Sequence, residues 1–95
     1  QTGFFRCGKP FAFQTYGVEP DIISMAKGIG GGVPMGGFAA RTSVAEVMRP
    51  GMHGTTFGGS PLACAASDAV TTLMSDPAFA QNVNEMGAYL REQIG

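Results

Sequence analysis

The chain has 95 residues, with six lysine or arginine side chains against seven aspartate or glutamate side chains, and a net charge of −1. These charges form no basic cluster, so the composition argues against binding to nucleic acid or to an anionic membrane surface. Glycine, proline or a charged residue interrupts every apolar stretch before the roughly 20 residues that span a bilayer. We expect a soluble protein of one domain at most.

The two cysteines, Cys7 and Cys64, are far apart in the sequence and form no C-x-x-C pair. The single histidine, His53, has no neighbouring ligands of the kind a zinc site requires. We therefore expect reduced structural cysteines, no metal site and a cytoplasmic protein. Because the chain begins at Gln1 without an initiator methionine, we also expect it to be a fragment of a longer polypeptide.

The N-terminal third is expected to be a loop over residues 1–9, followed by a short helix that opens at Pro10 and ends at Gly17. Residues 19–21 form a turn, and the apolar run after them predicts a buried strand near residues 22–26. Lys27 stands at the carboxyl end of that strand. A cluster of glycines follows it directly.

A second buried strand is expected at residues 36–40, where small side chains permit close packing. Ser43 and Glu46 have the spacing of a capping box and predict a helix through about Met48. Residues 51–60 form a second glycine-rich loop. Two amphipathic helices follow, each opened by a capping residue and a proline, at Ser60-Pro61 and at Asp76-Pro77. Strands near 22–26 and 36–40 with helices around them favour an α/β layer architecture.

The first glycine cluster does not match the common nucleotide-binding motifs. A P-loop places its lysine after the glycines, whereas Lys27 precedes Gly28. The dinucleotide-binding fingerprint fails because its third glycine falls on Val33 or Met35. A lysine at the carboxyl end of a strand lies where open α/β sheets hold ligands, and a desolvated amine there can act as a nucleophile in Schiff-base chemistry. A solvated lysine at a turn is the alternative.

The second glycine loop carries two adjacent hydroxyls, Thr55 and Thr56, just before a helix start. Hydroxyls and backbone N–H groups in such a position are suited to binding phosphate. Ordinary turn chemistry explains the same residues, so the pair carries weight only together with Lys27.

Four blocks of the sequence, in order, resemble the class III aminotransferases, which are fold-type I enzymes that use pyridoxal 5′-phosphate. The blocks are Gln1–Phe4 with Arg6 and Gly8, Gly17–Ile22, Ala26–Pro34, and His53–Gly59 with Pro61–Cys64. They span essentially the whole chain. Within the class, the sequence of these blocks most resembles that of acetylornithine and succinylornithine aminotransferases.

The resemblance implies that residues 1–95 are part of the large, cofactor-binding domain, a three-layer α/β/α structure. It also implies that Lys27 forms the Schiff base with pyridoxal phosphate and later moves the substrate's proton. Gln1 matches a glutamine near the pyridine 3-oxygen. Thr56 matches a threonine that reaches the cofactor phosphate across a dimer interface, and Thr55 matches a neighbouring substrate contact.

Three residues depart from the family pattern: Phe5, Cys7 and Ser60 replace a common glycine, threonine and asparagine. The family's aspartate that pairs with the pyridinium nitrogen belongs just before Gln1, outside this sequence.

The expected activity is transfer of an amino group from N-acetylornithine, or a related ω-amino compound, to 2-oxoglutarate by a homodimer. Ornithine and 4-aminobutyrate aminotransferases share the same motifs. The alternative from a different class is a truncated, non-catalytic module for binding or assembly, and we expect little turnover from residues 1–95 alone.

Overall fold

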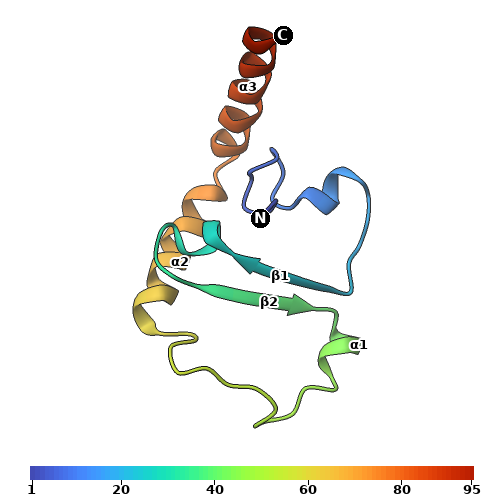
Figure 1. Cartoon of the computed structure of the whole chain (residues 1–95), viewed down its shortest axis with the longest axis vertical. Coiled ribbons are helices and arrows are strands. Elements are labelled where there is room, and N and C mark those ends of the chain that lie inside the picture. Colours follow the sequence, from blue (N-terminus) through green and yellow to red (C-terminus); the bar gives the residue numbers. More distant parts are fainter.

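The computed structural model describes all residues from 1 to 95 and contains short 3-10 helices, one strand pair and three α-helices (Figure 1). The elements in order are η1 (Ala12–Thr15), β1 (Ile22–Ala26), η2 (Lys27–Gly30), β2 (Gly36–Ala40), α1 (Thr42–Ala45), α2 (Pro61–Met74) and α3 (Pro77–Ile94). The strand pair crosses the middle of the molecule, and α2 and α3 follow one another along one side of it. This mixture of elements agrees with the predicted α/β class.

The two strands lie at the predicted positions and pair antiparallel. Their register runs from Ile22 opposite Ala40 to Ala26 opposite Gly36. Residues 27–35 connect them, and this connection begins with η2, which packs against α2. The strand pair therefore presents Lys27 at one end, while the chain enters β1 and leaves β2 at the other.

The prediction that both strands are buried is wrong for these residues. Side chains of β1 alternate between exposed and half-buried, and β2 is exposed except at Ala40. The sheet has only two strands, so both of its edges and much of its faces stay open. Only Gly30 and Ala63 are buried, and they belong to η2 and α2, which pack against each other.

The two long helices begin where the sequence predicts, each with a proline in its first turn. Asp76 caps α3, because its carboxylate accepts a hydrogen bond from the backbone N–H of Ala78 at 2.9 Å. Ser60 occupies the N-cap position of α2, but its side chain makes no capping hydrogen bond. The apolar stripe of α3 is half-buried at Phe79 and Val83 and exposed farther along the helix.

Two smaller predictions are corrected. Helix α1 begins after Arg41, so Ser43 lies inside it and cannot serve as the cap of a Ser43–Glu46 capping box. The first short helix starts after Phe11 rather than at Pro10, because the Gln14 side chain accepts a hydrogen bond from the Phe11 N–H at 2.9 Å. The Gln14 side chain thus sets the start of η1, whereas α1 begins after Arg41 without a side-chain cap.

The molecule is elongated, with a radius of gyration of 15.9 Å, whereas a compact domain of about 100 residues has one of about 13 Å. Leu62, Leu73, Leu90 and Ile94 are among the large apolar residues left exposed on α2 and α3. No helix combines the length and the hydrophobicity needed to cross a membrane.

The capping difference between α2 and α3 yields a stability prediction. Asp76→Ala removes the only side-chain cap hydrogen bond of the two long helices, so we expect the free energy of unfolding to fall by about 1 kcal/mol. Ser60→Ala is the matched control, since it changes an N-cap residue that makes no such bond. Urea denaturation of the full-length protein, followed by circular dichroism, measures both. Equal losses in the two variants would contradict the assignment.

Candidate active site

A cleft of about 360 Å³ lies between the N-terminal segment, β1 and the start of α3. Its walls are largely apolar and aromatic, and Gln1 and Lys27 contribute the two polar side chains of interest. Few polar groups in a mostly apolar pocket are typical of a ligand site.

Lys27 directly follows β1 and opens η2, with φ at 53°. This is the left-handed region, which costs a non-glycine residue of order 1–3 kcal/mol and is enriched at functional sites. The lysine amine donates a hydrogen bond to the Gln1 side-chain oxygen at 2.5 Å. The structure thus brings together two of the four predicted site residues, which are far apart in the sequence.

The N-terminal segment is held against this lysine by aromatic packing. A Cβ added at Gly28 would lie only 3.0 Å from the Cβ of Phe4, so the absence of a side chain permits the close approach. Phe4 also meets the edge of Phe11, with ring centroids 5.5 Å apart. Phe4 and Phe5 both have positive φ, at 53° and 62°. No sequence pattern signals left-handed phenylalanines, so this support was missed in the sequence.

Helix α3 holds the same segment from the other side. Phe5 packs edge-on against Phe79 with ring centroids 5.6 Å apart. Farther along α3, the Asn84 side-chain amide donates a hydrogen bond to the carbonyl of Gly8 at 3.1 Å. These contacts fix the loop at residues 3–8 as one wall of the cleft. Phe5, which departs from the family pattern, thereby gains a packing role.

Thr55 and Thr56 do not join this cleft. Both are exposed, in the irregular loop before α2, and neither lines the space beside Lys27. In Figure 1 the loop passes on the opposite side of the strand pair from the N-terminal segment. The sequence therefore carries two separate groups of candidate residues, one at Lys27 and one at the threonines.

The remaining candidate side chains are isolated. Cys7 and Cys64 are free and exposed. His53 faces Phe38 of β2 edge-on, with ring centroids 6.2 Å apart. Among residues 1–95 no group of three or more histidine, cysteine or acidic side chains is placed to hold a metal ion.

Comparison with known proteins identifies the family. The model of the class III aminotransferases matches residues 1–95. The chain is 48% identical over 94 residues to acetylornithine aminotransferase of Streptococcus mutans, covering 99% of this chain and 25% of that protein. It is 46% identical to the Bacillus subtilis enzyme of the same name, covering 24% of it. The chain belongs to the class III aminotransferases.

Solved structures of aminotransferases have the same fold as this chain. The acetylornithine aminotransferase of Elizabethkingia anophelis superposes with a TM-score of 0.89 at 36% identity, over 99% of this chain and 24% of that one. The ornithine aminotransferase of Toxoplasma gondii superposes with a TM-score of 0.91 at 38% identity, over 99% of this chain and 22% of that one. The α/β fold predicted from the sequence is therefore confirmed. The chain spans about a quarter of the length of these relatives.

Members of this enzyme family depend on pyridoxal phosphate, which confirms the cofactor expected from the sequence. The residues present fit that group. A primary amine lies in a partly apolar cleft, beside an amide that can donate or accept hydrogen bonds. Gly28 lets Phe4 pack closely beside the lysine, because a Cβ at position 28 would lie only 3.0 Å from the Cβ of Phe4.

The glycines after Lys27 give a second prediction. Gly31, at φ 59°, would place a Cβ 2.3 Å from a methyl of Val70 on α2, whereas Gly17, at φ 64°, has nothing within 4 Å. Gly31→Ala and Gly17→Ala should both cost about 1 kcal/mol for the left-handed backbone. Gly31→Ala should cost a further 1–3 kcal/mol, roughly, for overpacking.

Chemical denaturation of the full-length variants measures this difference. Equal losses for Gly31→Ala and Gly17→Ala would show that η2 is not packed against α2 as described. Because η2 begins with Lys27, we also expect cofactor affinity to fall in Gly31→Ala alone.

Proposed function

We propose that the protein is an aminotransferase in which Lys27 binds pyridoxal phosphate covalently. The amino group moves from N-acetylornithine to 2-oxoglutarate. The observation that carries the proposal is the Lys27 amine, placed at the end of β1 in the cleft and hydrogen-bonded to Gln1. Membership of a family of pyridoxal-phosphate enzymes supplies the chemical context.

When bound, pyridoxal phosphate supplies an electron sink that stabilises negative charge at the substrate carbon that bears the reacting amine. Lys27 would hold the cofactor through its primary amine, which the substrate's amine would replace. The Nζ of Lys27 lies in the cleft, where it could accept the proton from the substrate carbon that bears the reacting amine and return it. Gln1 holds this amine by a hydrogen bond and, in the proposed complex, contacts the cofactor ring.

The relatives favour N-acetylornithine as the donor, because the proteins most similar in sequence carry the name acetylornithine aminotransferase. Ornithine is the second candidate, supported by the structural similarity to an ornithine aminotransferase. 4-Aminobutyrate is the third. Incubating the full-length protein with 2-oxoglutarate and each donor, and measuring glutamate, decides between them. No glutamate from any of the three would refute the proposed reaction.

The cofactor-binding threonine is proposed to act across a homodimer. Thr56 is exposed and lies outside the cleft that holds Lys27, so it can serve a cofactor bound to a second copy of the chain. Thr55, beside it, is proposed to contact the substrate. Hydroxyl and backbone N–H donors in this glycine loop are suited to a phosphate group.

The role of Lys27 predicts a covalent label. After incubation with pyridoxal phosphate and reduction with borohydride, the full-length protein should carry a pyridoxyl group on the peptide containing Lys27. Lys27→Ala should lose the label, and its transamination rate should fall by a factor of about 100 to 10,000. Lys9→Ala, which changes an exposed lysine outside the cleft lining, should retain both. Equal labelling of Lys27→Ala would overturn the assignment.

The role of Thr56 in the dimer predicts complementation. Thr56→Ala alone should weaken cofactor binding by about tenfold, the value of one hydrogen bond to a charged group. In a mixed dimer with Lys27→Ala, one site loses both residues while the other regains both. Activity at low cofactor should therefore exceed that of either parent homodimer. If Thr56 acted within its own subunit, mixing would restore nothing.

A further inference from the structure

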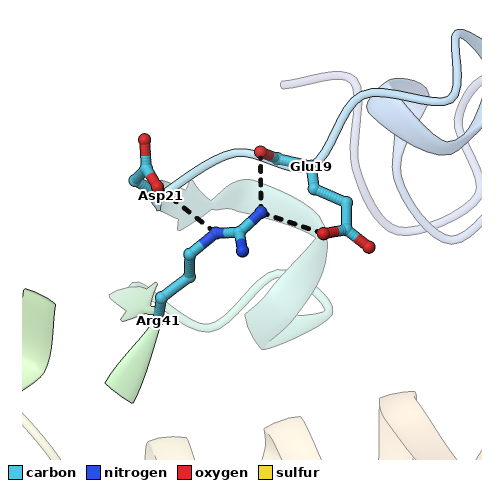
Figure 2. Close-up of polar contacts among 3 residues, drawn as sticks. All are labelled: Glu19, Asp21 and Arg41. Atoms are coloured by element: carbon cyan, nitrogen blue, oxygen red, sulfur yellow. Dashed lines mark hydrogen bonds and ion pairs between the residues drawn. The ribbon is translucent and has the colours of Figure 1, made fainter. Parts of the chain in front are cut away.

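Arg41 follows β2 directly and binds two residues that lie just before β1 in the chain (Figure 2). Its Nη2 donates to the Glu19 carbonyl at 3.2 Å and to the Glu19 carboxylate at 2.9 Å. Its Nε lies 3.3 Å from the Asp21 carboxylate. Its backbone N–H also donates to the Asp21 carbonyl at 3.0 Å. Arg41 therefore adds one more paired position beyond Ile22 and Ala40.

The strands themselves specify their register weakly. The sequence of β2, residues 36–40, is Gly-Gly-Phe-Ala-Ala, and its one large side chain, Phe38, lies opposite Ser24. Glycine-rich strands are prone to slip, because few side chains distinguish one alignment from the next.

The connection between the strands does not correct this weakness. A two-residue hairpin turn fixes register by its geometry. Here the connection runs over residues 27–35 and contains four glycines, which tolerate many backbone paths. No tight turn therefore fixes the alignment at the end of the strand pair that carries Lys27.

We propose that Arg41 is a positioning residue that sets the register of the lysine-bearing strand. A slip of one residue would move Lys27 by about 3.3 Å along β2 and turn over the faces of one strand. It would also separate the Lys27 amine from Gln1. The inference rests on the proposed function, since the position of Lys27 matters because the cofactor is bound there.

The chemistry of the three side chains suits this role. The guanidinium fork of arginine can bind both acidic residues at once, which a single ammonium group cannot do with fixed geometry. Both ion pairs of Arg41 are solvent-exposed, with side-chain exposures of 44% for Arg41, 83% for Glu19 and 78% for Asp21. Exposed ion pairs contribute little to global stability. The expected effect is therefore a choice between alignments rather than loss of the fold.

Cysteine cross-linking measures the alignment directly. In full-length protein with its native cysteines replaced by serine, Ile22→Cys with Ala40→Cys reports the observed register. Ile22→Cys with Ala39→Cys reports a slip of one residue, because directly opposed residues lie within disulfide reach. Arg41→Ala should raise the slipped cross-link by about fivefold, the upper range for an exposed ion pair. Arg91→Ala, which removes the same charge from α3, should leave the pattern unchanged.

Cofactor affinity provides the second measurement. Arg41→Ala should raise the apparent dissociation constant for pyridoxal phosphate in inverse proportion to the fraction of molecules that keep the observed register, and Arg41→Lys should lie between. Exchanging the charges, with Arg41→Glu and Glu19→Arg together, should restore part of each value, because the ion pair between positions 19 and 41 returns while Asp21 then faces a like charge. This rescue distinguishes a loss of alignment from simple misfolding.

An unchanged cross-link pattern in Arg41→Ala would overturn the proposal, and so would weaker cofactor binding without any slip. A different measurement, the pyridoxyl label, tests the proposed function. If the unmodified protein acquired no pyridoxyl label on Lys27, that function would be refuted, while the cross-links would still report what Arg41 does to the register.

Discussion

The antiparallel pairing of β1 with β2 is the constraint on which the candidate site depends. It carries Lys27 at one end and connects, through β2 and the following loop, to the threonines on the far side of the sheet. Neither strand is buried enough among residues 1–95 for side-chain packing alone to fix it. Backbone hydrogen bonds and the Arg41 contacts with Glu19 and Asp21 hold it in one alignment.

Much of the local structure could be predicted because it follows from nearby residues. Proline after a capping residue located the start of α2 and α3, an apolar run after a turn located β1, and a run of small residues located β2. These signals act within a few positions of the element they define. The cap predicted at Ser43 was wrong, because α1 already begins at Thr42.

What the sequence could not supply is the long-range arrangement. Nothing in the spacing indicates that Phe5 meets Phe79, or that Asn84 reaches the carbonyl of Gly8. The prediction that both strands are buried was wrong for a related reason, because an apolar run predicts burial but does not identify what covers the strand. For the site, the resemblance to a known family assigned Lys27 and Gln1 their roles. The structure brings their side chains into hydrogen-bond contact.

The glycines between Lys27 and β2 have a thermodynamic consequence for the cofactor. Glycine loses more conformational freedom on folding than any other residue, so this connection opposes its own ordering more strongly than an ordinary loop. A cofactor joined covalently at the first residue of the connection would bind only the ordered chain. By mass action it would then stabilise the fold as well as the active site. Loss of pyridoxal phosphate from such an enzyme would be a step toward unfolding, not only a loss of catalysis.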